Sequence, residues 1–556
     1  MADTANEDRD HLHTMGYAQE LHRSMSTFSN FAISFSIISI LAGGMTAFWL
    51  GMVTGGPRVI TIGWIVVGFF ALLVGMAMGE ICSAYPTAGG LYYWSAKLAK
   101  KNGPRWSWFT GWFNLLGQIG VIASVDYALS IFIGYFIRMF DDNYRLTPAG
   151  IFLIFLGVLV AHGLLNTFRI DLVKVLGDIS VWWHVVGVAV IAGVLFIAPS
   201  NTRGIGGAFD KAPPGLTGWT GTGLMVTIYL FALGLLLAQY TITGFDASAH
   251  VSEETVGART EAPKAIVRSI YVSAIAAIIL NLSMISALPK KGADGDAIYA
   301  GIAYGPAEDP FLVNAANRLI SSAVGTGTAK LLVFICIVGQ FFCGLASVTA
   351  NSRMIYAFSR DGALPGSKIW HKINPKTRTP TNSVWLGVTL SAILGATSLY
   401  VRGDGAGKYS TAFFAMTGIC VIGLYIAYSI PIYLRLTNPD FQTGPWNLKG
   451  KHKLVGWTAL AWVGFITILF FAPLFRPFWP IWGDKNLFFD DGAGTTFYRQ
   501  NNFNFTGPLI ILSAIAFGLY WRFSGKKWFT GPKVQGTKEE LLAIERELEA
   551  SSGMKS

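Results

Sequence analysis

Runs of about 20 apolar residues recur along the chain, each long enough to cross the roughly 30 Å hydrocarbon core of a bilayer as a helix. Hydrophobic residues make up 52% of the 556 residues and charged residues only 13%. Soluble domains are about 25% charged. A bilayer offers no hydrogen-bond partners, so a spanning segment must satisfy its backbone groups internally, as a helix does. The sequence therefore predicts an all-α membrane protein.

Hydropathy predicts twelve transmembrane helices. They cover residues 28–54, 59–82, 107–137, 148–166, 172–198, 222–254, 264–288, 330–357, 382–401, 410–435, 454–475 and 506–523. We expect 1–27 to be a cytoplasmic N-terminal tail, 28–435 a ten-helix core, 454–523 two additional helices, and 524–556 a cytoplasmic C-terminal tail. Residues 1–27 contain no short apolar stretch with a cleavage site, so no removable signal peptide is predicted.

The distribution of charge predicts the orientation. Net charge is +11, and most of the 42 Lys and Arg residues fall in the segments that share a side with the termini. The opposite side carries acids such as Asp141 and Asp294. The positive-inside rule places both termini in the cytoplasm. Since topology accounts for the basic charge, nucleic acid is not an expected partner.

Motifs typical of enzymes are missing from the sequence. It contains no P-loop, no nucleophile elbow, and no His, Cys and carboxylate cluster with metal-ligand spacing. Cys82, Cys336, Cys343 and Cys420 lie in or beside apolar runs and are interpreted as small apolar fillers. The chain is therefore not expected to be an enzyme, and no cofactor or metal is predicted.

Glycines interrupt two of the predicted helices near their middles. Gly43 and Gly44 lie in the first span, and Gly244 lies in "TGFDASAHVSEET" (243–255) of the sixth. Each glycine lowers helix propensity by about 1 kcal/mol relative to alanine. A separation of five spans is typical of a five-plus-five inverted repeat in which the first helix of each half is discontinuous. Helix packing through small residues is the alternative for Gly43 and Gly44.

A broken helix exposes N–H groups on one half and C=O groups on the other. The N–H end favours a carboxylate and the C=O end an ammonium group, so two adjacent breaks predict a site for a zwitterion. Asp246 is interpreted as the N-cap of the second half of span six, in preference to a direct ligand. Phe245 is interpreted as an aromatic gate, with core packing as the alternative.

Several ionisable residues lie within or beside the spans. His184, in the middle of span five, is a candidate for taking and releasing a proton, because its usual pKa of about 6.5 is close to neutral pH. A neutral histidine bonded to Ser180 or to a carbonyl is the alternative. Asp126 in span three is interpreted either as facing the site or as pairing with a local partner. For Glu253, Glu254, Arg353 and Arg360, weak surface pairing is favoured over an inner gate.

Two short helices are predicted outside the spans. Residues 311–325 are helical in character but too polar to span, and are interpreted as a lid over the outer mouth. Residues 537–550 are typical of a soluble helix, with a capping box from Thr537 to Glu540 and an apolar stripe that includes Leu541. A packing helix without a specific function is favoured for this segment.

Four stretches carry a resemblance to a known superfamily. They are "FSIISILAGG" with "TGGP" (35–44, 54–57), "GEICSAYPTAGGLYYWSAKLA" (79–99), "TGFDASAHVSEET" (243–255) and "ANSRMIYAFSRDGALP" (350–365). The chain resembles the amino acid–polyamine–organocation (APC) superfamily, and is most similar to the amino acid/choline transporter family that includes γ-aminobutyrate permeases. The resemblance implies a LeuT-type fold, with ten core helices in two inverted repeats plus two more.

The resemblance also implies a substrate site, in which backbone atoms at the breaks of spans one and six bind the amino and carboxylate groups. The corresponding residues are Ala42, Gly43, Gly44, Met45, Thr46, Thr243, Gly244, Phe245 and Asp246. Related proton-coupled permeases carry a lysine in span five that faces the break of span one, and His184 corresponds to it. Sodium is the alternative coupling ion, with Ser347 and Thr349 as candidate ligands.

The predicted function is secondary active import of an amino acid or related amine, such as γ-aminobutyrate, across the plasma membrane. Proton symport by alternating access is the expected mechanism, with a small-molecule substrate, a proton and membrane lipid as partners. The alternatives are an amino acid or amine exchanger, a choline or polyamine transporter, and a non-transporting nutrient sensor. Trp182 and Trp183 suit a quaternary amine by cation–π attraction, but lipid-facing positions explain them equally well.

Overall fold

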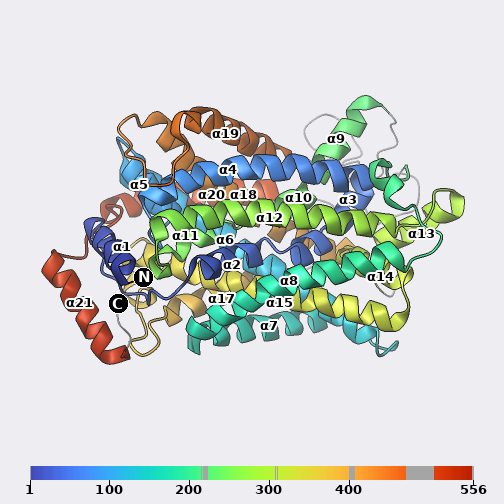
Figure 1. The fold of residues 1–556 in the computed structure, drawn as a ribbon, viewed down its shortest axis with the longest axis horizontal. Helices are drawn as coiled ribbons and strands as arrows, with labels where there is room; N and C mark the ends of the chain where they lie inside the picture. Colours follow the sequence, from blue (N-terminus) through green and yellow to red (C-terminus); the bar gives the residue numbers. More distant parts are fainter. Residues whose placement is uncertain are drawn as a thin grey trace.

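The computed structural model describes residues 2–168, 170–214, 216, 223–306, 309, 311–399, 407–470 and 506–553. Over these ranges the chain is helical and forms no β-strand. The long helices run side by side along the long axis of the molecule (Figure 1). This arrangement confirms the all-α prediction.

Twelve helical segments of the described chain are long and apolar enough to cross a membrane, which confirms the predicted number. They are Thr27–Gly44, Val59–Ala84, Gly103–Arg138, Pro148–Phe168, Leu172–Ile197, Leu224–Thr241, Ala258–Ser286, Thr326–Arg360, Thr381–Leu399, Phe413–Thr437, Lys449–Leu469 and Thr506–Lys527. Residues 222, 400–401 and 471–475 of the predicted spans lie outside the described residues.

Most spans are single continuous helices. These are α4 (Trp64–Ala84), α6 (Gly103–Arg138), α7 (Pro148–Phe168), α8 (Ile170–Ile197), α12 (Ala258–Ser286), α15 (Thr326–Arg360), α17 (Thr381–Gly395), α18 (Gly407–Thr437), α19 (His452–Leu469) and α20 (Thr506–Phe523). The first and sixth spans are divided. They consist of α2 (Thr27–Ile37), η1 (Ile40–Gly44) and α3 (Phe48–Thr54), and of α9 (Leu224–Gly234), α10 (Leu236–Thr241) and α11 (Ala247–His250).

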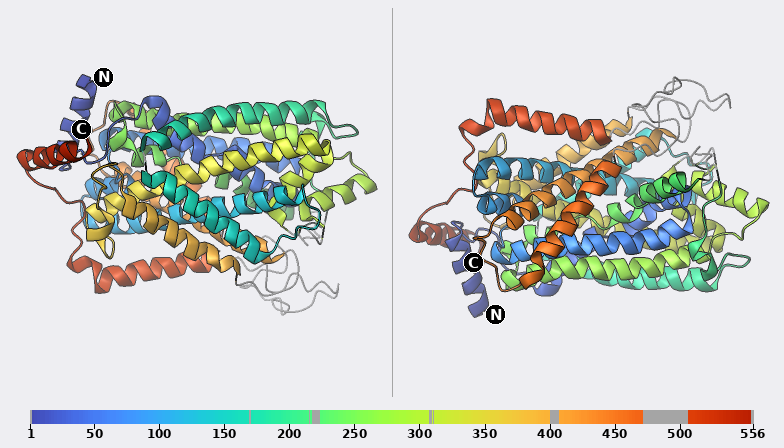
Figure 2. Two further views of the ribbon diagram at one scale, coloured as in Figure 1. Left: turned by 90° about the horizontal axis from the view of Figure 1, so that it is seen from below. Right: turned by 90° about the horizontal axis from the view of Figure 1, so that it is seen from above.

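Helix α6 is central and α20 is peripheral. The most apolar window of α6 is 78% buried, and the helix packs against α18, α15, α7 and α5 (Leu91–Leu98). The corresponding window of α20 is only 17% buried, and this helix lies along the outside of the bundle (Figure 2). The core that positions the site therefore lies between α6, α15, α18 and the two divided spans.

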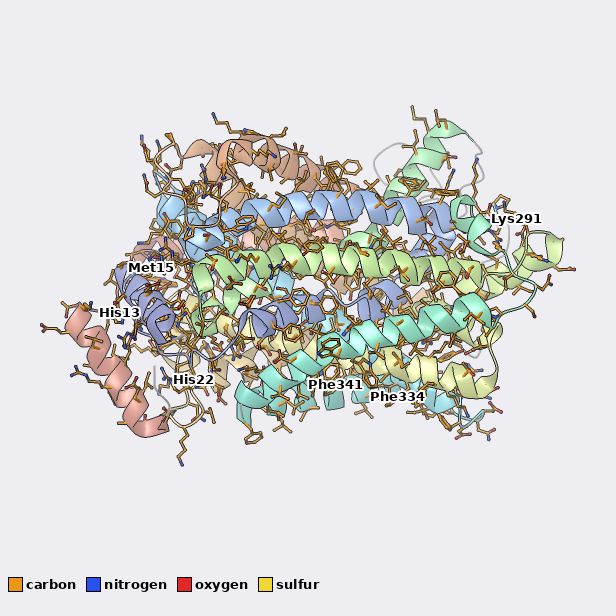
Figure 3. The ribbon with its side chains drawn as sticks, in the orientation of Figure 1. His13, Met15, His22, Lys291, Phe334 and Phe341 are labelled. Carbon is orange, nitrogen blue, oxygen red and sulfur yellow. The ribbon has the colours of Figure 1, made fainter. Side chains whose placement is uncertain are left out.

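Both termini lie at the same end of the bundle, which we call the terminal face (Figure 1). This end carries α1 (Ala2–Thr14) and α21 (Lys538–Ser552), whereas α13 (Ala293–Tyr304) and α14 (Ala315–Ala323) lie at the other end. The side chains of His13 and Lys291 mark the two ends (Figure 3).

The two short predicted helices are present. Helix α14 lies within residues 311–325, as predicted, and its first residues are buried. Helix α21 begins with the predicted capping box, in which Thr537 and Glu540 exchange hydrogen bonds. Helix α21 packs on the N-terminal segment, because Glu545 accepts hydrogen bonds from the Gln19 amide and the His13 ring, each at 2.7 Å.

Candidate functional site

The first span is interrupted shortly before its paired glycines. Helix α2 ends at Ile37, and the chain resumes as a π-helical turn from Ile40 to Gly44. Ser39 caps this turn, because its hydroxyl accepts a hydrogen bond from the Ala42 amide at 3.0 Å. The break expected at Gly43 and Gly44 is therefore displaced toward the N-terminus: α2 ends at Ile37, and the glycines lie in the turn that Ser39 caps.

The sixth span is interrupted at the predicted place. Helix α10 ends at Thr241 and α11 begins at Ala247. Gly244 lies between them with a φ of +86°, a conformation that L side chains rarely adopt. Glycine at this position is thus a backbone requirement of the break.

The two interruptions face each other. A Cβ atom added to Gly43 would lie 2.9 Å from the Thr241 Cα, and one added to Gly244 would lie 2.4 Å from the Ile37 side chain. Ser34 of α2 joins the two spans, since its hydroxyl donates to the Phe245 carbonyl at 2.9 Å and accepts from the Ser248 amide at 2.9 Å. Discontinuous segments of spans one and six therefore meet inside the bundle.

The nine residues expected to bind substrate gather at this junction and are all buried. They are Ala42, Gly43, Gly44, Met45, Thr46, Thr243, Gly244, Phe245 and Asp246. Gly43 and Thr243 line one cavity, and Gly244 and Asp246 line a second. Phe245 packs against the rings of Tyr425 and Tyr428, with centroids 6.4 and 5.0 Å away.

Tyrosine hydroxyl groups from α18 satisfy backbone groups of the span-six break. Tyr425 donates to the Ile242 carbonyl at 3.1 Å. Tyr428 accepts from the Gly244 amide at 3.3 Å and donates to Asp246 Oδ1 at 2.6 Å. An unpaired backbone group at this depth would cost several kcal/mol. These hydroxyls therefore occupy positions that polar groups of a ligand could take.

Asp246 occupies the N-cap position of α11, but its side chain makes no capping hydrogen bond. The interpretation of this side chain as a cap is wrong. Its Oδ2 atom instead faces the Asn114 amide at 3.2 Å and His250 Nε2 at 3.2 Å. Because Asp246 has a helical backbone conformation and lies beside α6 and α18, tertiary partners replace the local cap.

His184 lies on α8 and contacts the break of span one. Its Nε2 atom lies 2.6 Å from the Ser39 hydroxyl, and its Nδ1 atom lies 2.8 Å from the Ser180 carbonyl. A neutral imidazole satisfies both contacts, with Nδ1–H donating and Nε2 accepting. The Ser39 hydroxyl thus connects His184 to the Ala42 amide.

Asp126 pairs locally with His162 of α7. The distance from Asp126 Oδ2 to His162 Nδ1 is 3.1 Å, and both side chains are fully buried. A Cβ added to Gly344 of α15 would lie 2.0 Å from Asp126 Oδ1, so glycine makes room for this pair. Of the two interpretations of Asp126, the structure supports local pairing.

The candidate sodium ligands do not converge. Ser347 lines the cavity beside Asp246, and its hydroxyl donates to the Cys343 carbonyl at 2.8 Å. The Thr349 hydroxyl donates to Asn166 of α7 at 2.7 Å. Thr349 therefore points toward α7, away from the break of span one.

Two buried ion pairs lie near the terminal face. Arg353 contacts both carboxylate oxygens of Glu254, at 2.7 and 3.2 Å, and Arg360 contacts both of Glu253, at 3.0 and 3.2 Å. The four side chains are at most 3% exposed. The Arg360 guanidinium lies over the ring of Tyr17 in the N-terminal segment, with Arg360 Cζ 3.7 Å from the ring centroid. The expectation of surface pairs is wrong, because all four side chains are buried and the N-terminal segment covers Arg360. We call these two pairs the gate pairs.

Several residues of the site were not found from the sequence. They are Ser34, Asn114, Gln118, His250, Tyr425 and Tyr428. Polar residues spaced three or four apart within an apolar span, such as Asn114 with Gln118 and Tyr425 with Tyr428, are the available signal. The tryptophans of span five do not form an aromatic site: Trp182 is 64% exposed, and the Trp183 indole donates to the Ile335 carbonyl.

Comparison with known proteins agrees with this architecture. The model of the amino acid permease family matches residues 25–519. The amino-acid permease BAT1 of Arabidopsis thaliana is 38% identical over 546 residues, which cover 94% of this chain and 95% of that protein. Its homolog in Oryza sativa subsp. japonica is 36% identical, covering 94% of each chain. The GABA-specific permease of Saccharomyces cerevisiae is 30% identical, covering 94% of this chain and 86% of its own length. The chain belongs to the amino acid permease family of the APC superfamily.

Proposed function

We propose that this permease imports an amino acid or a related amine, such as γ-aminobutyrate, across the plasma membrane by proton symport. The proposed architecture is a core of residues 28–435, made of two inverted five-helix repeats, followed by two additional helices at 454–523. Both termini lie in the cytoplasm in this proposal, and the terminal face is the inner face. Transport proceeds by alternating access to the junction of spans one and six.

The junction of the two interrupted spans is the observation that supports this proposal. Its backbone groups are held by hydroxyls, such as that of Tyr428 at the Gly244 amide, which a substrate carboxylate can displace. Exchange of one hydrogen bond for another costs little, whereas an empty buried site would leave the amide unpaired. Substrate binding at Gly244 thus requires only a small rearrangement of α18.

His184 is the proposed coupling residue on span five. Its hydrogen bond to Ser39 links the protonation of its ring to the capped turn that carries Gly43 and Gly44. A protonated imidazole donates from both nitrogens, so the Ser39 hydroxyl would have to reverse its direction. Protonation at His184 would therefore be transmitted to the backbone of the break.

A transport assay with the full chain in proteoliposomes tests the proposal. Radiolabelled γ-aminobutyrate and a panel of labelled amino acids are offered under an imposed pH gradient, and separately under a sodium gradient. We expect accumulation of at least one compound with the pH gradient alone. Accumulation that requires a sodium gradient would show that sodium, and not the proton, is the coupling ion. Release of labelled compound from the proteoliposomes that occurs only when substrate is present outside would identify an exchanger.

A further inference from the structure

His250 forms a buried pair with Asp246, which is itself one of the residues of the substrate junction. Both side chains are at most 2% exposed, and His250 Nε2 lies 3.2 Å from Asp246 Oδ2, one helical turn away. On the other side of the ring, His250 Nδ1 lies 2.9 Å from the Ala88 carbonyl. The imidazole is therefore held between a carboxyl group and a carbonyl oxygen.

These two contacts fix the number of protons that the pair holds. A carbonyl oxygen can only accept, so Nδ1 carries a proton. If Nε2 were bare and Asp246 ionised, two lone pairs would face each other across 3.2 Å. Moving the ring proton to Nε2 creates the same conflict at the Ala88 carbonyl. A hydrogen bond on both sides requires one more proton, carried either by the imidazole or by the carboxyl group.

The other buried histidines do not require an additional proton. His162 also contacts a carboxylate, Asp126, but only through Nδ1, so the neutral ring serves with Nδ1–H as donor. His184 faces the Ser39 hydroxyl, which can donate to a bare nitrogen. The pair of His250 and Asp246 differs from both, because a group that cannot donate lies at each ring nitrogen unless Asp246 is protonated.

The groups around the pair come from three elements. Helix α18 contributes the hydroxyl of Tyr428, whose ring packs against the ring of Tyr425 with centroids 5.2 Å apart. Helix α6 contributes only the amides of Asn114 and Gln118, and the segment before α5 contributes the Ala88 carbonyl. Among the described residues, no lysine or arginine forms an ion pair with Asp246. The extra proton is therefore the charge-balancing partner of this carboxyl group.

Hydrogen bonds connect the pair to the substrate junction. The Tyr428 hydroxyl donates to Asp246 and accepts from the Gly244 amide. A substrate carboxylate that captures this amide would alter the hydrogen bonding of Tyr428, and through it the charge that Asp246 can hold.

A second connection leads to the gate pairs. Ala88 accepts from His250 through its carbonyl and donates to Glu253 Oε1 through its amide, at 2.9 Å in both cases. Glu253 is the partner of Arg360. Opening of the terminal face would therefore displace the residue that holds the imidazole, and would expose the pair to solvent on that side.

From these contacts we infer that His250 and Asp246 bind a coupled proton at a site separate from His184, and release it when the gate pairs open. The inference rests on the proposed function. It adds a proton site that responds to the occupancy of Gly244 on one side and to the gate on the other.

Spectroscopy on the full-length protein tests the proton without a substrate. In NMR spectra of protein with ¹⁵N-labelled histidine, the ring-nitrogen resonances that disappear in His250→Gln belong to His250. Infrared spectroscopy detects the band of a protonated carboxylic acid. We expect at neutral pH either an imidazolium at His250 or a carboxylic acid band that Asp246→Asn removes. A neutral imidazole beside an ionised carboxylate would overturn the inference. His162→Gln is the matched control, because it removes a buried histidine that also contacts an aspartate but leaves the proton signal in place.

Transport in proteoliposomes tests the coupling. With labelled γ-aminobutyrate and a labelled amino acid mixture as probes, His250→Gln is expected to lower pH-driven accumulation at least tenfold relative to His371→Gln. The control changes a partly buried histidine whose ring contacts the Ser367 carbonyl. Full pH-driven accumulation by folded His250→Gln would overturn the coupling role. Failure of the unmodified protein to accumulate any compound under a pH gradient would instead overturn the proposed function, while the spectroscopic result would still decide the proton site.

Discussion

Gly43 and Thr241 bring the backbones of the two interrupted spans into direct contact. A Cβ on Gly43 would lie 2.8 Å from the Thr241 hydroxyl and 2.9 Å from its Cα, closer than Cβ atoms approach other heavy atoms. Because part of the obstacle is backbone, a side-chain rotation cannot relieve it. The proximity of the two breaks therefore depends on the missing side chain of residue 43.

The first prediction follows from this contact. Gly43→Ala is expected to push the breaks apart at a cost of about 1–3 kcal/mol, which corresponds to a loss of roughly fivefold or more in uptake. Initial rates of uptake in proteoliposomes measure the effect. Gly193→Ala is the control, since nothing lies within 4 Å of a Cβ at that position of α8. Equal rates in the two variants would contradict a close junction.

Gly344 gives a prediction about stability. Gly344→Ala would place a methyl group 2.0 Å from Asp126 Oδ1 and 2.5 Å from the His162 ring. We expect overpacking and disruption of the buried pair to destabilise the protein by about 1–3 kcal/mol. Thermal unfolding followed by fluorescence and size-exclusion profiles measures this change. Gly327→Ala, near the start of the same helix with open space around it, should leave the melting temperature unchanged.

The gate pairs should behave as buried ion pairs. Arg353→Gln leaves Glu254 buried without its partner, which costs about 3–5 kcal/mol. The double variant Arg353→Gln/Glu254→Gln should recover most of this loss, because no uncompensated charge remains. Folded yield and melting temperature of the two single variants and the double variant measure the coupling.

An exposed ion pair provides the control for the variants of Arg353 and Glu254. Lys100 and Asp440 lie 3.1 Å apart, with side chains 51% and 81% exposed. Lys100→Gln should change stability by less than about 1 kcal/mol. A similarly small effect of Arg353→Gln would show that the terminal face is hydrated and not closed by the gate pairs.

The role of His184 is decided by substitution. His184→Gln keeps a hydrogen-bonding side chain on α8 but cannot take up a proton, so we expect pH-driven accumulation to fall at least tenfold. Ser39→Ala should have a smaller effect, of about 1 kcal/mol, because it removes the cap at the Ala42 amide. Unchanged pH-driven uptake in a series of folded His184 variants would end the coupling role of this residue.

Docking of α1 should weaken in acid. Desolvation, followed by the nearby charge of Arg259, lowers the pKa of His11 below 6.5. Since the folded state favours the neutral ring, the contribution of His11 to docking is present above pH 6.5 and is lost as the pH falls through its lowered pKa. Limited proteolysis of the N-terminal segment should accelerate as the pH is lowered from neutral. His11→Gln should remove this pH dependence, and an identical pH profile in the variant would contradict it.

The number and place of the spans were predictable because hydropathy is a property of the chain itself. The break at Gly244 was also predictable, because the backbone there has a φ of +86°, which favours glycine, and a glycine inside an apolar run is visible in the sequence. The break of span one lies earlier than expected: α2 ends at Ile37, and Ser39, a serine in an apolar run, caps the turn that carries the paired glycines. Local patterns favour glycine as the breaking residue, and they do not show which hydroxyl will cap a turn.

Two of the partners of Asp246 could not be predicted from local sequence. His250 lies only one helical turn away, but the hydrogen bonds of Asn114 and Tyr428 come from α6 and α18, which are distant in sequence. The burial of the gate pairs depends likewise on the N-terminal segment, whose Tyr17 covers Arg360. Sequence patterns predict which residues are costly to bury, whereas the helix packing determines how that cost is offset.

The contact between Glu545 and Gln19 also concerns biosynthesis. Gln19 precedes Glu545 by 526 residues, so the segment that covers the gate pairs leaves the ribosome well before the helix that holds it. Until this helix has been synthesised, the bundle lacks the contact that fastens the N-terminal segment. The finished arrangement of this face can form only after residues 538–552 have left the ribosome.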